Sequence, residues 1–475
     1  MQYSQYISGE FRQGSSEINY EVINPATAEI LGTLQFTSAQ DIADAIQSAH
    51  QAFKVWRKTT AYDRSVKIRQ IAKLMYERTD DLAQQISLEL GKPLVEAKKE
   101  VQTAAEMFEW ASEEARRIYG KTIAPRTANI KQTVVYEPVG VVAAFSGWNA
   151  PAITPARKIS AALAAGCSIV IKPSEETAGI ALKIAQIIDE LDFPQGLVNM
   201  VFGNPEEISN ILCESPEISM ITFTGATSIG QSLAAKASKH LKKLTLELGG
   251  HAPVIICEDV DVEKVAKAAV AAKFRNAGQV CTSPTRFLIQ QSIFNKFSEK
   301  FTNYARQIKV GSPFDGSTQM GPLKNLRRLH AIDSLVQNAR ALGAEITAGG
   351  SKFENLSECY YAPTVIVQPP FEAQVNHIEP FGPIAILKSF NDLDDALEEA
   401  NRLPFGLASY AFTNNFSYIE RISNEIESGV ISINDWQASL PETPFGGVKD
   451  SGLGTEGGAE GIHEFLKIKT LRIAS

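Results

Sequence analysis

The sequence predicts an α/β protein built on parallel sheets, and three observations support this. Short apolar runs alternate with helical patterns along most of the chain, which is typical of parallel strands joined by crossover helices. The chain has 475 residues, more than one hydrophobic core usually holds, so we expect at least two domains. The extended sequence at 131–145, interrupted by Pro138 and Gly140, predicts a projecting β-ribbon.

The first third of the chain is predicted to be rich in helices. Over residues 41–56 the apolar positions recur at steps of three and four, which indicates one buried helical face. Further helices are expected at 63–78 and from Asp80 onwards. The last of these ends at Gly91, with Pro93 just behind it, as is usual for a helix end.

Strands and helices then alternate, which predicts parallel sheets with helices on both faces. The expected strands lie at residues 168–171, 197–202, 218–223, 253–257, 286–289, 383–387 and 429–433. The expected helices lie at 177–191, 231–240, 292–309, 326–342 and 393–401. The pattern of the sequence changes near Gly249 and Gly250, and we place the boundary between the two domains there.

Composition narrows the function classes. The formal net charge is −8 and basic residues are interspersed with acidic ones, so we expect no nucleic-acid partner. No apolar signal core follows Met1, and no run of about 18 apolar residues occurs, so we expect a cytoplasmic protein that does not span a membrane. The five cysteines show no C-x-x-C spacing, which predicts neither a disulfide framework nor a metal site.

Cys281 is the one cysteine whose surroundings suggest chemistry. It follows the run Asn276-Ala-Gly-Gln-Val, whereas the other cysteines have bland neighbours typical of small buried hydrophobes. Upstream, Glu247 is a lone carboxylate among leucines and glycines. A free thiol has a pKa of about 8.5, so a nearby carboxylate can activate either the thiol or a later attacking water. The pair predicts attack on a carbonyl substrate.

Three further motifs lie near predicted strand ends, and each also has a plain structural interpretation. The run from Phe223 to Gly230 joins a strand to a helix, and it is either a phosphate seat or only a tight turn. The charged side chains of Lys172-Pro-Ser-Glu175 can bind the hydroxyl groups of a ribose, or the segment is an ordinary loop exposed to solvent. Asn149, in Trp148-Asn-Ala-Pro151, can donate to an oxyanion, or it is an ordinary turn residue.

The order of these motifs resembles the aldehyde dehydrogenase superfamily, from near the N-terminus to near the C-terminus. The resemblance rests on Ile23-Asn-Pro-Ala-Thr27, Trp148-Asn149, Lys172-Pro-Ser-Glu175, Phe223-Thr-Gly225, Glu247-Leu-Gly-Gly250, Gly278-Gln-Val-Cys281, Glu379-Pro-Phe-Gly-Pro383 and Pro444-Phe-Gly-Gly447. It implies a Rossmann-type coenzyme domain (1–122 and 146–249), an α/β catalytic domain (250–449) and a β-ribbon oligomerisation element (123–145 and 450–475). It also implies a homodimer or homotetramer.

The resemblance further implies an oxidation that depends on NAD or NADP. Cys281 attacks the aldehyde, the oxyanion rests on the Asn149 amide and the Cys281 backbone amide, and the thiohemiacetal gives up hydride. Glu247 then activates the water that hydrolyses the thioester, while Glu456 aligns with an acidic position that assists proton movement. The positions implied for the cofactor are Trp148, Lys172, Ser174, Glu175, Gly225, Gly230, Glu379 and Phe381.

The similarity is closer to the succinate semialdehyde and 2-oxoglutarate semialdehyde dehydrogenases, through residues 271–281 and 445–452. Arg157 and Arg275 match the positions that bind the substrate carboxylate in that branch. The alternative for each arginine is a salt bridge inside the fold. A broad-specificity aldehyde dehydrogenase, a CoA-acylating dehydrogenase and a non-enzymatic cofactor-binding scaffold also stay open, and an intact Glu247 counts against the last two.

The sequence departs from the family pattern at three positions. Gly147 replaces the proline common before Trp-Asn, which can loosen that turn. Ala226 replaces the usual serine beside the pyrophosphate, which removes one phosphate contact unless a neighbouring hydroxyl replaces it. Ser283 stands where some relatives carry a cysteine, so no disulfide with Cys281 can form there.

Overall fold

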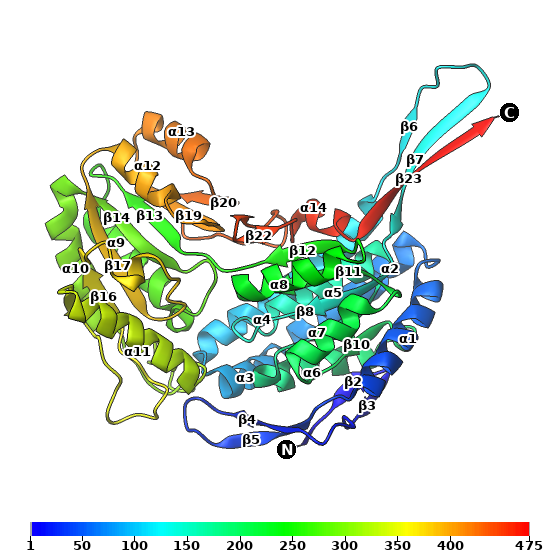
Figure 1. The fold of residues 1–475 in the computed structure, drawn as a ribbon, viewed down its shortest axis with the longest axis horizontal. Helices are drawn as coiled ribbons and strands as arrows, with labels where there is room; N and C mark the ends of the chain where they lie inside the picture. Colours follow the sequence, from blue (N-terminus) through cyan, green and yellow to red (C-terminus); the bar gives the residue numbers. More distant parts are fainter. Residues whose placement is uncertain (1, 475) are drawn as a thin grey trace.

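The computed structural model describes residues 2–474, and two separate sheets form the body of the molecule (Figure 1). The larger sheet has a core of parallel strands with antiparallel strands at both edges. In sheet order its strands are β22 (Gly452–Leu453), β12 (Lys243–Glu247), β11 (Ile218–Thr224), β8 (Val141–Phe145), β9 (Ser168–Lys172), β10 (Val198–Met200), β2 (Gln5–Ile7) and β3 (Glu10–Arg12).

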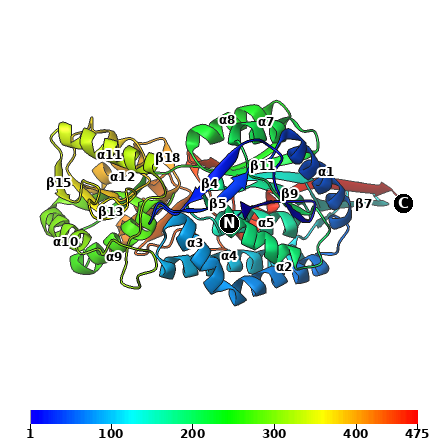
Figure 2. The ribbon, with the colours of Figure 1, turned by 90° about the horizontal axis from the view of Figure 1, so that it is seen from below.

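Helices cover both faces of this sheet, as predicted (Figure 2). Val142 and Ala144 of β8 pack into one hydrophobic cluster, whereas Val141, Ala143 and Phe145 pack into the other, because successive side chains point to opposite faces. The first face is covered by α2 (Ala61–Glu77), α3 (Thr79–Leu90), α4 (Leu94–Glu114), α5 (Ile153–Ala165) and α6 (Ala178–Asp189). The second is covered by α1 (Ala39–Trp56), α7 (Pro205–Glu214) and α8 (Thr227–Ser238).

The smaller sheet has seven strands, all parallel except its first edge strand. In order these are β15 (Glu345–Ala348), β16 (Thr364–Val367), β17 (Ile384–Phe390), β14 (Pro284–Gln290), β13 (Ala252–Ile256), β19 (Ala408–Phe412) and β20 (Val430–Ile433). One face packs against α9 (Val262–Phe274), α10 (Phe294–Arg306) and α11 (Leu326–Ala341). The other packs against α12 (Leu393–Asn401) and α13 (Phe416–Glu425).

A three-stranded antiparallel ribbon projects from the body (Figure 1). It consists of β6 (Lys121–Ile123), β7 (Ile130–Pro138) and β23 (Leu466–Ala474). The expectation that the ribbon extends to residue 145 was wrong, because β8 lies in the middle of the larger sheet. Five consecutive apolar residues are typical of a strand buried on both faces, and Pro138 ends β7 rather than interrupting it.

The segment 450–475 likewise does not all belong to the ribbon. Its first strand, β22, pairs with β12 in the larger sheet, and the short helix α14 (Gly458–His463) packs against α5. Two small sheets complete the fold: one joins β1 (Gln2–Tyr3), β5 (Ile30–Gln35) and β4 (Asn19–Ile23), and the other joins β18 (Phe405–Gly406) and β21 (Val448–Lys449). Within residues 2–474, no helix combines the length and the apolar character needed to cross a bilayer.

Candidate active site

Four parallel strands of the larger sheet end together at one edge. The register pairs Lys172 with Phe145, Phe145 with Phe223, and Thr224 with Glu247. The final residues of β9, β8, β11 and β12 therefore lie side by side, at the edge where open α/β sheets bind ligands. The sequence motifs that follow these strands meet there.

A cavity of about 540 Å³ lies between this edge and the loops of the smaller sheet. Its volume is within the range of small-molecule sites. The predicted site residues that line it are Trp148, Asn149, Arg157, Gly225, Glu247, Arg275, Cys281, Glu379 and Phe381. The predicted site residues that do not line it are Lys172, Ser174, Glu175, Gly230 and Glu456.

Cys281 is partly exposed and lines the cavity together with Glu247. The pKa of the Cys281 thiol is raised well above its usual range, mainly by burial and next by the negative charge of the Glu247 carboxylate. The pKa of Glu247 is raised to about 7, mainly by burial and next by the nearby carboxylate of Glu456. Oε1 of Glu247 has no hydrogen-bond partner among the residues described. A carboxyl group that titrates near neutrality beside a thiol can accept its proton.

Asn149 lies on the loop between β8 and α5, facing the loop that leads to Cys281. Its Nδ2 donates a hydrogen bond to the carbonyl of Gln279 at 3.2 Å. An amide nitrogen carries two protons, so one stays available to a group in the cavity. The side chain is therefore oriented by the neighbouring loop and still able to donate.

Glu456 lies behind the cavity in a buried ion cluster. Lys158 Nζ is 2.5 Å from Glu456 Oε1 and 2.9 Å from Thr222 Oγ1, and Arg157 Nη1 is 3.5 Å from Glu456 Oε2. Burial alone would raise the pKa of Glu456, but Lys158 and Arg157 outweigh it and lower the pKa. Sequence reasoning missed Lys158, although two consecutive cations in an otherwise apolar helix are a sign of a buried partner.

Arg157 pairs with Glu456, as expected of a salt bridge inside the fold, and it also lines the cavity, where binding of a substrate carboxylate stays a prediction. Its Nη2 donates to Ser439 Oγ at 2.7 Å, and its buried Nε has no hydrogen-bond partner in the described part of the chain. Ser439 also lines the cavity and was not predicted. Arg275 is exposed there and forms no hydrogen bond or ion pair with another side chain among residues 2–474.

The rest of the cavity fits a dinucleotide. The N-terminus of α8 has Ala226 as its cap residue and no side chain that caps it, so the amides of Thr227 and Ser228 stay open to a phosphate. A Cβ on Gly225 would lie 2.6 Å from the Phe223 ring, so any larger residue here would have to displace that ring. The rings of Trp148 and Phe381 meet edge to face at 5.6 Å on the cavity wall.

The predicted cofactor residues outside the lining have local roles. Lys172 forms an ion pair with Glu175, and the Ser174 hydroxyl caps a short helical turn. Gly230 is buried in α8, where a Cβ would lie 2.3 Å from Leu248, so close packing accounts for this glycine. Contact of these residues with a cofactor stays a prediction.

Comparison with known proteins identifies the family. The profile of the aldehyde dehydrogenase family matches residues 11–471. A 4-(hydroxymethyl)benzenesulfonate dehydrogenase of Comamonas testosteroni is 42% identical over 466 residues, which cover 98% of this chain and 96% of that protein. The succinate-semialdehyde dehydrogenase [NADP(+)] of Escherichia coli is 38% identical over 467 residues, which cover 98% and 97%.

A solved structure confirms the predicted fold class. The crystal structure of succinate-semialdehyde dehydrogenase from Burkholderia pseudomallei superposes with a TM-score of 0.97 at 38% identity, covering 100% of this chain and 98% of that one. Both its sequence and its fold thus match along the full length. The chain therefore belongs to the aldehyde dehydrogenase family and is an oxidoreductase.

Proposed function

We propose that the protein oxidises an aldehyde that carries an anionic group at its other end, with NAD or NADP as the hydride acceptor. The observation that carries the proposal is the presence of Arg157 and Arg275 in the same cavity as Cys281. A guanidinium group stays charged at physiological pH and can hold a carboxylate through two parallel hydrogen bonds. An acidic semialdehyde such as succinate semialdehyde or 2-oxoglutarate semialdehyde has the required chemistry.

The names of the relatives support an anionic substrate, although they differ in the anion. The E. coli and B. pseudomallei proteins are named for succinate semialdehyde, which ends in a carboxylate. The C. testosteroni protein is named for a benzenesulfonate. Both groups offer several acceptor oxygens to a guanidinium, so the shared feature is a negative charge remote from the reacting carbon.

In the proposed first half-reaction, the Cys281 sulfur attacks the aldehyde carbon and the thiol proton is released to water in the cavity, so that Glu247 stays available as a base for the second half. The carbonyl becomes an oxyanion, which accepts hydrogen bonds from Asn149 Nδ2 and from the Cys281 backbone amide. The oxyanion then collapses, hydride leaves the carbon, and a thioester remains on Cys281. The bound nicotinamide cofactor supplies the acceptor for that hydride.

In the proposed second half-reaction, Glu247 removes a proton from water, and the resulting hydroxide adds to the thioester carbonyl. The C–S bond breaks, the carboxylic acid leaves, and Cys281 regains its thiol. Glu456 lies close enough to raise the pKa of Glu247, and in this proposal it assists the departure of the proton.

The two sheets divide the work in this proposal. The part built on the larger sheet holds the nucleotide at the open N-terminus of α8, and the part built on the smaller sheet presents Cys281. The ribbon of β6, β7 and β23 joins copies of the chain into a homodimer or homotetramer. Ile468 and Ile473 on β23 are more than half exposed, which suits such a contact.

A sulfonated aromatic aldehyde is a second candidate substrate, favoured by the aromatic residues in the cavity. Phe445 lies under the Arg157 guanidinium at 4.8 Å, and Trp436 is backed by the rings of Tyr410 and Phe412. Flat aromatic walls stack favourably against a substrate ring. This candidate differs from the first only in the group between the anion and the aldehyde.

Steady-state kinetics tests the proposal. The substrates are succinate semialdehyde, 2-oxoglutarate semialdehyde, 4-formylbenzenesulfonate and uncharged butanal, each with NAD and NADP. We expect at least one anionic aldehyde to exceed butanal by about 100-fold in kcat/KM, and Arg275→Met to remove that advantage while leaving butanal nearly unchanged. Equal kcat/KM for charged and uncharged aldehydes would instead favour a broad-specificity enzyme.

A further inference from the structure

We propose that Lys92, Glu96 and Glu100 form a positioning clamp that holds the two loops of the oxyanion site in place. The inference rests on the role proposed above for Asn149 and the Cys281 backbone amide. None of the three clamp residues lines the cavity. They act on the reaction through backbone groups of the two loops that carry the oxyanion donors.

One half of the clamp fixes the loop that carries Asn149. Glu100, on α4, accepts the backbone N–H of Ala152 at 2.9 Å and forms an ion pair with Lys92. Lys92, in the turn before α4, donates to the carbonyl of Asn149 at 3.2 Å. The Lys92 and Glu100 side chains are 8% and 3% exposed. Desolvation largely cancels the attraction within such a pair, so fixing geometry is its clearest contribution.

The other half fixes the loop that leads to Cys281. Glu96 lies one helical turn before Glu100, so both carboxylates project from the same side of α4. Its Oε2 accepts the backbone N–H of Asn276 at 2.9 Å. Asn276 and Ala277 have φ angles of 49° and 53°, in the left-handed region that non-glycine residues rarely adopt. A loop in this conformation depends on contacts from outside to keep its shape.

Asn276 joins the two halves of the clamp. Its Nδ2 donates to the carbonyl of Asn149 at 3.1 Å and to the carbonyl of Gln279 at 3.2 Å. The Asn149 carbonyl thus accepts two hydrogen bonds, one from Lys92 and one from Asn276. The Gln279 carbonyl in turn holds the Asn149 side-chain amide. Misplacing a reacting group by about 1 Å can cost about 100-fold in rate, so this geometry matters for catalysis.

Apolar packing already holds α4 in the fold, which leaves the polar residues free for this task. The buried apolar residues of α4 include Ala97, Val101, Ala104 and Phe108. They pack into the cluster on one face of the larger sheet. The carboxylates of Glu96 and Glu100 add little to that packing, yet each accepts a backbone N–H from a different loop of the site.

The first test uses two substitutions of Glu96 and a control on the same helix. Glu96→Ala should slow the single-turnover burst of reduced nucleotide by about tenfold, with little change in KM for either substrate. Glu96→Gln keeps an acceptor oxygen and should restore most of the rate. Lys98→Met, which removes an ion pair with Asp80 at the surface, should leave the burst unchanged.

A deuterated aldehyde gives a readout that lost stability would not move. If the clamp variants slow the hydride step, the primary isotope effect on kcat should grow in Glu96→Ala and in Lys92→Met relative to the Lys98→Met control. An isotope effect equal to the control in soluble, folded Glu96→Ala would overturn the clamp. If Lys92→Met does not fold, the Glu96 pair of variants still decides.

Asn149→Ala separates failure of the clamp from failure of the proposed function. If the clamp serves the oxyanion site, each clamp substitution should slow the burst much less in the Asn149→Ala background than alone. An unchanged burst in Asn149→Ala itself would remove the oxyanion role and the function built on it. A slower burst in Asn149→Ala, with the clamp variants additive to it or silent, would overturn the clamp alone.

Discussion

Cys281 and Glu247 lie together at the cavity as a thiol and a carboxyl group, and in the proposed mechanism the carboxyl sets the pH dependence of turnover. Burial and Glu456 raise the pKa of Glu247 to about 7, so the group becomes a competent base as the pH rises through that value. We expect kcat to increase between about pH 6 and pH 8, following one ionisation near 7. Stopped-flow and steady-state rates measured across that range will check this.

Glu247→Gln is the matched test, because it removes the base and keeps the size of the side chain. The burst of reduced nucleotide should survive, steady-state turnover should fall by about 10²–10⁴-fold, and the ionisation near 7 should vanish from kcat. Cys281→Ala should abolish burst and turnover alike. Equal loss of both steps in Glu247→Gln would contradict the separate role given to the base.

The same raised pKa has a consequence for stability. The Glu247 carboxyl binds a proton more tightly in the folded protein than in the unfolded chain, whose ordinary value is 4.5. Its contribution to stability is therefore fully present below pH 4.5 and is lost as the pH rises towards 7. Glu247→Gln should remove that dependence, which unfolding curves at a series of pH values will show.

Short motifs predicted Cys281, Glu247 and Asn149 because each motif keeps its chemistry within a few neighbouring residues, and the structure brings all three to one cavity. Ser439 and Lys158 could not be found in this way. The bond of Ser439 to Arg157 spans 282 residues, and that of Lys158 to Glu456 spans 298. Such pairs depend on how distant segments of the chain come together in the folded protein, which no local pattern records.

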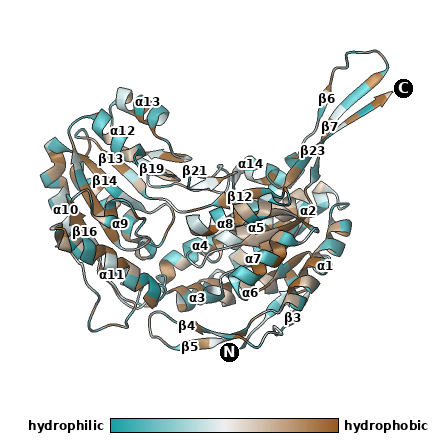
Figure 3. Ribbon diagram, viewed as in Figure 1, coloured by the Kyte–Doolittle hydropathy of each residue, from teal (hydrophilic) through white to brown (hydrophobic). Residues whose placement is uncertain are grey.

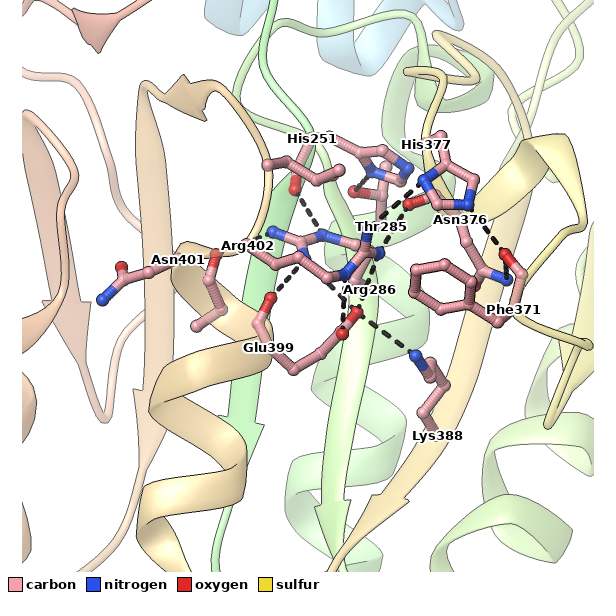
Figure 4. Close-up of polar contacts among 12 residues, drawn as sticks. His251, Thr285, Arg286, Phe371, Asn376, His377, Lys388, Glu399, Asn401 and Arg402 are labelled. Atoms are coloured by element: carbon pink, nitrogen blue, oxygen red, sulfur yellow. Dashed lines mark hydrogen bonds and ion pairs between the residues drawn. The ribbon is translucent and has the colours of Figure 1, made fainter.

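Among the elements, the segment between β16 and β17 is the one that carries Glu379 and Phe381 to the cavity. A polar network on the smaller sheet holds this segment (Figure 4). Arg402 donates to the carbonyl of Asn376 at 2.9 Å, contacts His377 Nδ1 at 3.2 Å and pairs with Glu399 at 2.8 Å. One guanidinium therefore ties the segment to the end of α12.

Arg402→Met should loosen that segment and weaken cofactor binding. We expect KM for the nucleotide to rise about tenfold, with a smaller change in kcat at saturation, because hydrogen bonds from a charged donor are lost away from the reacting atoms. Arg421→Met is the control, since its ion pairs on α13 are exposed. An unchanged KM in Arg402→Met would show that the network stabilises the sheet alone.

The sequence predicted elements whose ends are marked by neighbouring residues. It did not predict to which sheet a strand belongs where this depends on the strands it pairs with. The helix expected at 41–56 is α1, whose start is fixed by a capping box between Ser38 and Asp41. The helix end expected at Gly91 is also present, with a φ of 78°. In contrast, 141–145 was placed in the ribbon, because its pairing with β9 and β11 is a property of the assembled sheet.

At the scale of the whole molecule, the ribbon stands away from both sheets and leaves strand edges open (Figure 1). Figure 3 shows hydrophobic stretches along its strands. Ile468 and Ile473 are 69% and 55% exposed, and β23 and β6 each end the ribbon's sheet without a further strand in the described part of the chain. Open edges and apolar side chains in one projecting element favour pairing with another chain.

The double substitution Ile468→Lys with Ile473→Lys tests this proposed assembly. Two charges placed on the contact should lower the oligomeric mass measured by light scattering, because a buried unpaired charge costs several kcal/mol. Leu342→Lys, just after α11 and far from the ribbon, is 43% exposed in the wild type and serves as the control. The cavity is lined by residues of this one chain, so the smaller species should keep its hydride burst. An unchanged mass in the double variant would mean that copies associate through another surface.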